Sequence, residues 1–208
     1  MAAARLSRKE SQEVTRARLR SSAIQAFARH GIAGSRIETI AEGAGYSRGA
    51  FYSNYRTKLD LLVDLLREKQ IREIQLWREV LSHTVDLESD MAQLAARYDG
   101  LTNVRERAML NSELQLEADR NEAFRPIFQA YLDAVYAETR TLFELMLERH
   151  GKRAPANLDA ILVTIRLLGL GLGSPSILGT EIVGRTSPGT IMLQFLSSVM
   201  ASAPAANS

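Results

Sequence analysis

The sequence predicts an all-α fold of about nine helices, and three observations carry this prediction. Apolar residues recur at helical spacing along most of the 208 residues, as Leu19, Ala23 and Phe27 illustrate. No run of alternating apolar and polar residues is long enough to indicate a strand. Residues that end or begin helices, such as Gly31 and the pair Ser187-Pro188, stand at the edges of the periodic segments.

Three short helices and a long one are expected at the amino-terminal end. Ser35 and Glu38 form a capping box for the second helix, and Gly45 breaks that helix. Ser47 and Thr57 carry hydroxyl groups that can cap the third and fourth helices. The expected spans are about residues 13–29, 36–44, 48–54 and 58–81.

Further helices are expected over about residues 87–100, 104–119, 122–150 and 157–172, and a last one opens at Pro188. A loop rich in Gly, Ser and Pro precedes the last helix, and the tail from Ala203 is expected to be disordered. We therefore expect two domains. Residues 1–57 would form an arm and a three-helix domain, and residues 58–208 a helical body.

Charge is distributed unevenly along the chain, although the total is only +2. The first 58 residues contain eleven Lys or Arg and four Asp or Glu, a net charge of +7, whereas the rest carries −5. A basic end on an acidic body is typical of a nucleic-acid-binding domain, and a solvated basic surface is the alternative.

The segment from Ile37 to Tyr55 has the pattern of a helix-turn-helix. Ala41 is small enough for a second helix to approach closely, and Gly45 permits the positive φ of a sharp turn. Phe51 then places the second helix against the first. An ordinary helical hairpin is the alternative. The side chains left outward are hydrogen-bonding or small, which suits a helix in the major groove: Ser47, Arg48, Gly49, Tyr52, Ser53 and Asn54.

These residues resemble the TetR family of regulators. The resemblance covers about residues 19–66, with the stretch SRGAFYSNYRTK as its core. Its specific features are the aromatic pair Phe51-Tyr52 and the lysine Lys58 that opens the fourth helix. Tyr46 departs from the pattern, because the family more often has a smaller aliphatic residue there. Beyond this segment the chain resembles the family only in length and helical layout.

The resemblance implies a set of DNA contacts. Arg48 and Asn54 would contact base edges, since arginine pairs with guanine and asparagine with adenine. For Ser35, helix capping is an equal alternative to a phosphate contact. The arm at residues 5–9 either reaches DNA or is a solvated tail. The implied DNA-binding residues are Ser35, Arg36, Ser47, Arg48, Gly49, Tyr52, Ser53, Asn54 and Lys58.

The resemblance also implies a homodimer built on the last two long helices, and each of these helices carries an apolar stripe. The alternative is that both stripes face the core of their own chain. The residues expected at the dimer interface are Leu162, Ile165, Leu168, Leu172, Met192, Phe195, Leu196 and Val199.

A pocket for a small apolar or aromatic effector is implied by the same analogy. Large side chains are the best candidates to line it, and an ordinary core position is the alternative for each. The candidates are Trp77, Leu81, Tyr98, Leu101, Met109, Leu110, Glu113, Phe128 and Tyr131.

Other classes of site are not expected. The chain has no cysteine, its three histidines have no metal-ligand spacing, and no serine, histidine and carboxylate form a set. The glycine-rich run at residues 168–173 is neither preceded by a strand nor followed by Lys-Ser or Lys-Thr, so it is no phosphate loop. We therefore expect no enzyme, no cofactor and no metal. The amino terminus lacks an apolar signal region, and no apolar run is long enough to span a membrane.

The sequence thus predicts a cytoplasmic transcription regulator that binds DNA. The favoured form is a repressor that leaves a partly palindromic operator when a small effector binds. An activator or a regulator without ligand is one alternative. A small-molecule carrier whose basic domain does not bind DNA is another.

Overall fold

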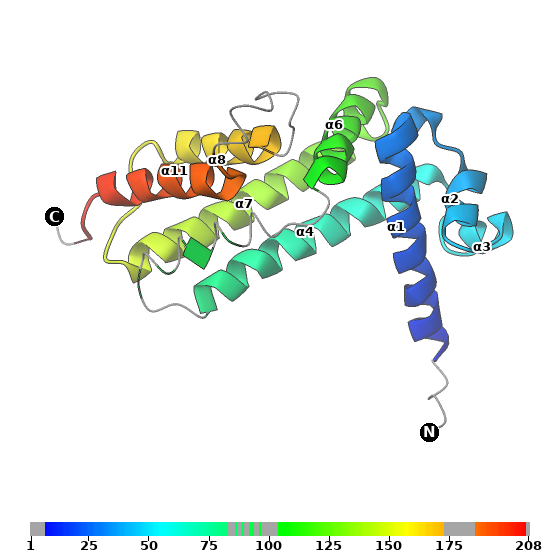
Figure 1. Cartoon of the computed structure of the whole chain (residues 1–208), viewed down its shortest axis with the longest axis horizontal. Coiled ribbons are helices and arrows are strands. Elements are labelled where there is room, and N and C mark those ends of the chain that lie inside the picture. Colours follow the sequence, from blue (N-terminus) through cyan, green and yellow to red (C-terminus); the bar gives the residue numbers. More distant parts are fainter. Residues whose placement is uncertain are drawn as a thin grey trace. The chain divides into compact units, whose positions relative to one another are not determined.

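The computed structural model describes residues 7–82, 86, 89, 92–93, 96, 104–172 and 186–206. Within these ranges it is all-helical apart from an isolated bridge between Lys152 and Ala205, which confirms the expected fold class (Figure 1). The expected helix over about 87–100 and the loop before the last helix lie mostly outside the described residues. The helices are α1 (Arg8–Gly34), α2 (Ile37–Gly43), α3 (Arg48–Tyr52), α4 (Lys58–Ser82), α6 (Val104–Arg120), α7 (Arg125–Arg149), α8 (Leu158–Leu172) and α11 (Pro188–Ser202).

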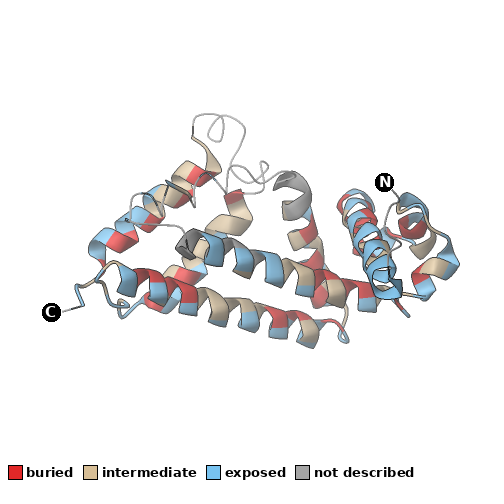
Figure 2. Cartoon of the chain, turned by 90° about the horizontal axis from the view of Figure 1, so that it is seen from below, coloured by how far each residue is buried: buried red, intermediate tan, exposed pale blue. Residues whose placement is uncertain are grey.

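The chain divides into two compact units. The first consists of Met1–Glu68 together with Met109–Phe128, so it contains α1, α2, α3, the start of α4 and most of α6. The second consists of Lys69–Ala108 together with Gln129–Ser208. Each long helix has a buried side and an exposed side, as the helical periodicity of the sequence predicts (Figure 2).

Helix α1 begins earlier and ends later than the periodicity predicts. Ser7 caps it in a capping box, because the N–H of Glu10 donates to Ser7 Oγ at 3.2 Å and the N–H of Ser7 donates to Glu10 Oε2 at 2.7 Å. Arg8 and Lys9 therefore lie in the first helical turn and not in an arm. At the other end Gly31 has φ +71° and ψ 164°, and the helix resumes as far as Gly34.

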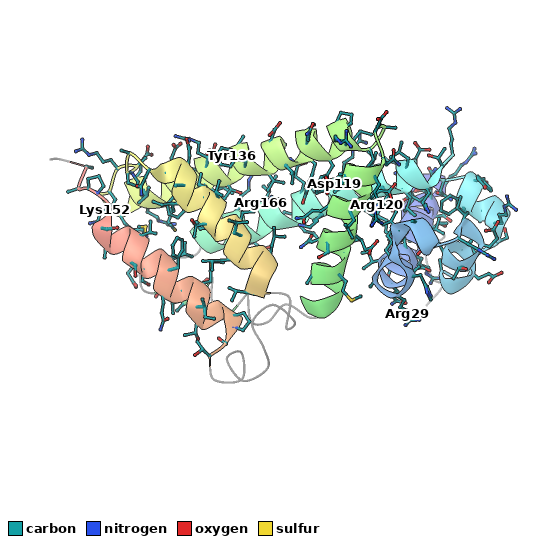
Figure 3. The ribbon with its side chains drawn as sticks, turned by 90° about the horizontal axis from the view of Figure 1, so that it is seen from above. Arg29, Asp119, Arg120, Tyr136, Lys152 and Arg166 are labelled. Carbon is teal, nitrogen blue, oxygen red and sulfur yellow. The ribbon has the colours of Figure 1, made fainter. Side chains whose placement is uncertain are left out.

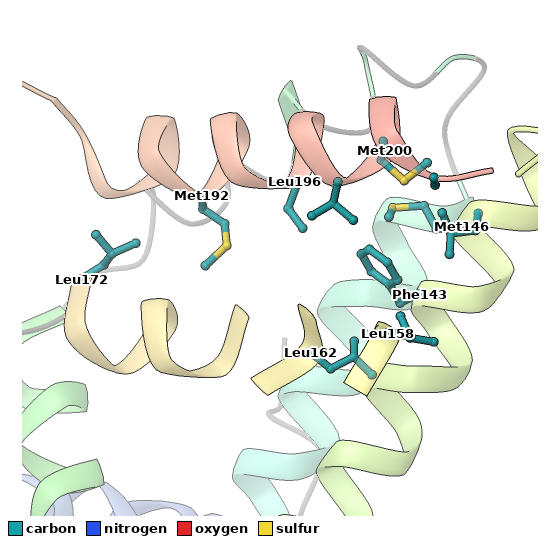
Figure 4. Packing of buried hydrophobic residues seen from close by; sticks show 11 residues of the cluster. Phe143, Met146, Leu158, Leu162, Leu172, Met192, Leu196 and Met200 are labelled. Atoms are coloured by element: carbon teal, nitrogen blue, oxygen red, sulfur yellow. The ribbon is translucent and has the colours of Figure 1, made fainter. Parts of the chain in front are cut away.

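The core of the second unit joins three helices (Figure 4). Phe143 and Met146 of α7 are fully buried, and so is Met200 of α11. Ser187 caps α11 and Pro188 stands in its first turn, as predicted. The remaining members of the cluster are Leu147, Leu158, Leu162, Leu172, Met192, Leu196, Val199 and Ala203.

The prediction of a disordered tail is wrong for residues 203–206. Gly151 has φ +65° and turns the chain after α7. The next residues then run beside the tail, where the N–H of Arg153 donates to the carbonyl of Pro204 at 3.0 Å. Lys152, which Figure 3 labels, donates its ammonium to the carbonyl of Ala203 at 3.2 Å. These hydrogen bonds stabilise a segment whose small residues alone predict no structure.

No helix among the described residues is both long enough and apolar enough to cross a membrane.

Candidate nucleic-acid interface

Helices α2 and α3 are joined by a tight turn that backbone hydrogen bonds define. The N–H of Gly45 donates to the carbonyl of Glu42 and the N–H of Tyr46 to that of Ala41, both at 2.9 Å. This pair of bonds is the Schellman motif that ends many helices. Gly45 has φ +78°, a left-handed value that favours glycine. The expected glycine break is therefore confirmed.

Helix α3 is packed by one aromatic residue and capped by one serine. Phe51 is fully buried, and its ring lies 5.7 Å from the rings of both Tyr52 and Tyr55. Ser47 accepts a hydrogen bond from the N–H of Ala50 at 3.2 Å, which confirms the predicted cap. A helix of five residues gains little stability by itself, so this packing and this cap hold it in place.

The outward face of α3 has the composition that the sequence predicts. Arg48 has a side chain that is 62% exposed, and its guanidinium lies 3.0 Å from Glu38 Oε1. The same guanidinium lies 5.5 Å from the centre of the Tyr52 ring. Such surface contacts are weak, so a base or a phosphate can replace Glu38 as the partner of the guanidinium. The exposed residues of this face are Ser47, Arg48, Gly49, Tyr52 and Ser53.

Two of the predicted DNA-binding residues, Ser35 and Lys58, make hydrogen bonds inside the domain. Ser35 is only 5% exposed, and its hydroxyl donates to the carbonyl of Gly31 at 2.7 Å. The predicted capping box at Ser35 is wrong, because Arg36 occupies the N-cap of α2 and makes no side-chain cap bond. The ammonium of Lys58 donates to the carbonyls of Ile32 at 2.6 Å and Ser35 at 3.2 Å. Arg36 is exposed, in keeping with the predicted contact.

Asn54 is half-buried at the end of α3. Its amide nitrogen donates to the carbonyl of Ala50 at 2.8 Å, and its Oδ1 is buried without a hydrogen-bond partner among the described residues. The side chain must therefore turn outward before it can pair with a base. The predicted base contacts of Asn54 and Arg48 both remain predictions.

A polar groove adjoins Asn54, and sequence reasoning missed most of it. The groove encloses about 270 Å³, and Arg8 is the charged residue in its lining. Its remaining lining residues are Ser11, Gln12, Thr15, Ser53 and Asn54. The signal that would have found it is the capping box of Ser7 and Glu10, which starts α1 early enough to bring Arg8 beside α3.

An ion-pair network ties the end of α3 to α1 and α4. The carboxylate of Asp64 accepts hydrogen bonds from Arg16 at 2.8 Å, from Arg20 at 2.8 Å and from the hydroxyl of Tyr55 at 2.6 Å. Burial alone would raise the pKa of Asp64, but the Tyr55 and Arg20 donors hold that pKa below its ordinary value. Burial and the bond to Asp64 raise the pKa of Tyr55 to about 12.

Comparison with known proteins finds a family whose members are similar to this segment. Residues 19–65 match the family described as "Bacterial regulatory proteins, tetR family". This segment of the chain is therefore similar to the TetR family. The chain is 41% identical over 59 residues to the HTH-type transcriptional repressor SCO4008 of Streptomyces coelicolor. That match covers 28% of this chain and spans only 31% of the relative's length.

Solved structures of low sequence identity share the overall fold of this chain. Salmonella enterica GusR has a TM-score of 0.70 at 20% identity, over 90% of this chain and 95% of that chain. A transcriptional regulator FadR from Bacillus subtilis in complex with stearoyl-CoA has a TM-score of 0.67 at 16% identity, over 89% of this chain and 97% of that chain. A putative transcriptional regulator from Saccharomonospora viridis in complex with choline has a TM-score of 0.65 at 20% identity, over 90% of this chain and 95% of that chain.

The predicted effector residues are described only in part. Tyr131 is buried in the second unit, and the ammonium of Lys69 lies 5.8 Å from the centre of its ring. Glu113 accepts a hydrogen bond from the N–H of Ile32. Leu110 and Phe128 are buried and Met109 is exposed, all in the first unit. The side chains of Trp77, Leu81, Tyr98 and Leu101 lie outside the described residues.

The predicted dimer residues of the helical body mostly face the core of their own chain. Ile165, Leu168 and Phe195 are half-buried against that core, whereas Val163 and Leu167 of α8 are exposed. Because Val163 and Leu167 are four residues apart, they share one face of α8. The buried members of the predicted set are Leu162, Leu172, Met192, Leu196 and Val199.

Proposed function

We propose that the chain is a transcription repressor that binds operator DNA as a homodimer, with α3 of each subunit in a major groove. The observation that carries the proposal is the exposed Arg48 on a capped helix of a TetR-family domain. Arginine is the side chain best suited to pair with guanine in that groove. The DNA-binding domain of this proposal is residues 1–57, and the helical body is residues 58–208.

Phosphate contacts of Arg36 and Arg8 would set the position of α3 on the duplex. Arg36 is exposed at the start of α2, and Arg8 lines the polar groove beside Ser53. Phosphate contacts fix register and orientation and carry no sequence information. The net charge of +7 on the first 58 residues supports a strong salt dependence of binding.

The dimer would use the exposed face of α8 that contains Val163 and Leu167. A second copy of the chain is the partner that fits, because a two-fold dimer places the same apolar patch of both copies in contact. The α3 helices of the two subunits must then enter successive major grooves, about 34 Å apart. The operator is accordingly a partial palindrome, and the regulator acts in the cytoplasm where that DNA lies.

A small apolar or aromatic effector would release the operator by binding to the body. Trp77, Tyr98 and Tyr131 are aromatic residues that the sequence offers for this site. An effector releases DNA only through different affinities for the free and DNA-bound states. Operator DNA must therefore weaken effector binding by the same factor, and calorimetry with and without operator tests this.

The proposal is tested by selecting genomic fragments with the purified protein at about 150 mM salt. Enrichment of one partly palindromic motif, with half-sites about one helical turn apart, is the expected result. Uniform retention of all fragments, or retention of none, would reject sequence-specific repression.

A further inference from the structure

The peptide groups of Ile32 are held from two sides at the break in α1. Its N–H donates to Glu113 Oε2 of α6 at 2.8 Å, and its carbonyl accepts from Lys58 Nζ, at the start of α4, at 2.6 Å. Ile32 is almost fully buried. The three residues lie within the first unit, although Glu113 is 81 residues from Ile32 in the sequence.

The backbone at Gly31 creates the need for this carboxylate. A φ of +71° with a ψ of 164° is a conformation that is essentially restricted to glycine. This ψ turns the peptide between Gly31 and Ile32 away from the helix axis, so its N–H needs an acceptor outside the helix. A Cβ on Gly31 would lie 2.9 Å from Glu113 Oε2, so glycine also makes room for the acceptor.

The position of Ile32 affects α2 and α3 because only a short stretch of chain connects it to them. Three residues separate it from Arg36, the N-cap of α2, and the Schellman turn at Gly45 holds α3 to α2. A displacement of Glu113 by about 1 Å would stretch its bond beyond hydrogen-bond range. The orientation of α2 and α3 therefore depends on where α6 holds the carboxylate.

We propose that Glu113 is a positioning residue for DNA recognition, acting through a clamp formed by Glu113, Ile32 and Lys58. The clamp keeps α2 and α3 in the orientation that reads the operator, and it makes α6 the element that controls this orientation. This inference rests on the proposed function. It also changes the role of Lys58, which serves the clamp by bonding backbone carbonyls.

The test compares three variants of the full chain. E113A removes the acceptor, whereas E113Q keeps an oxygen that can accept the N–H of Ile32. D119N is the matched control, because Asp119 is exposed on the same helix (Figure 3). Each variant is checked for folding by circular dichroism. The exchange rate of the Ile32 amide and the affinities for operator and random DNA are then measured.

In E113A we expect at least about tenfold faster exchange at Ile32 and about tenfold weaker operator binding, which corresponds to ~1.4 kcal/mol. Affinity for random DNA should stay constant, because the phosphate-binding charges remain. E113Q should remain within about threefold of wild type by partial retention of the bond, and D119N should match wild type. Unchanged exchange at Ile32, or operator affinity that is unchanged or increased, would overturn the proposal.

The variant Lys58→Met and the exchange rate of the Ile32 amide keep the result interpretable. If E113A does not fold, Lys58→Met tests the carbonyl side of the same peptide, and an unchanged preference for operator over random DNA would overturn the clamp. A wild-type protein that selects no DNA sequence rejects the proposed function. Exchange at Ile32 would then still decide whether Glu113 holds the peptide.

Discussion

Replacing Asp64 by alanine should destabilise the DNA-binding domain. The carboxylate accepts hydrogen bonds from Arg16, Arg20 and Tyr55, which come from α1 and from the end of the α3 segment. Alanine removes the carboxylate that both guanidinium groups share. The expected effect is therefore a loss of folding free energy with no change of fold.

The magnitude follows from the burial of the two arginines. Removing one partner of a fully buried ion pair costs about 3–5 kcal/mol. The Arg16 side chain is 32% exposed and that of Arg20 is 11% exposed, so water replaces part of the lost contact. Arg20 also keeps Glu13 at 2.7 Å. We therefore expect a loss of about 2 kcal/mol.

Urea titration and thermal melting followed by circular dichroism measure this loss. For a chain of this length, about 2 kcal/mol corresponds to a Tm lower by roughly 4–8 °C. Glu42→Gln, which removes an exposed carboxylate on α2, is the control and should stay within about 0.5 kcal/mol. A change below about 0.5 kcal/mol for Asp64→Ala would refute the view that this network holds the domain together.

Two further predictions concern pH and assembly. The pKa of Tyr55 is raised from 10.0 to about 12, so its stabilising contribution is complete below pH 10 and is lost as pH rises toward 12. Tyr55→Phe should accordingly show a flatter loss of stability over that range in urea titrations, and parallel profiles would contradict the assignment. Leu167→Glu should split the dimer, because Leu167 is 62% exposed in the single chain and the dimer would bury the new charge. Leu145→Glu, at a position that is 51% exposed on α7, should leave the dimer intact. Light scattering distinguishes these outcomes, and a dimeric, folded Leu167→Glu would place the interface elsewhere.

The sequence predicted those features that depend on a few neighbouring residues. The left-handed turn at Gly45, the cap at Ser47 and the proline start of α11 are all present. Thr57 also caps α4 as predicted, since its hydroxyl accepts from the N–H of Asp60 at 3.1 Å. Each depends on bonds that reach three to five residues along the chain, and such bonds leave a readable pattern.

Features that depend on distant residues were not predictable from local patterns. The sequence around Ser35 fits a capping box, but the Ser35 hydroxyl donates to the carbonyl of Gly31. Lys58, from the start of α4, donates to the carbonyl of Ser35 at the same end of α1. The Asp64 network joins residues up to 48 positions apart, and no local pattern indicates it. A close approach of α1 and α2 was also missed, where a Cβ on Gly43 would lie 2.5 Å from Ser22 Oγ.

The most direct test of the central claim compares Arg48→Ala with Arg56→Ala on operator and random DNA. Arg48 lies on the exposed face of α3, whereas Arg56 is an exposed arginine beyond that helix. Loss of a base contact costs about 1–3 kcal/mol, so Arg48→Ala should weaken operator binding by at least about fivefold more than random DNA. Arg56→Ala should weaken both DNAs alike or neither. Equal loss on operator and random DNA for Arg48→Ala would contradict the claim that α3 reads the operator through Arg48.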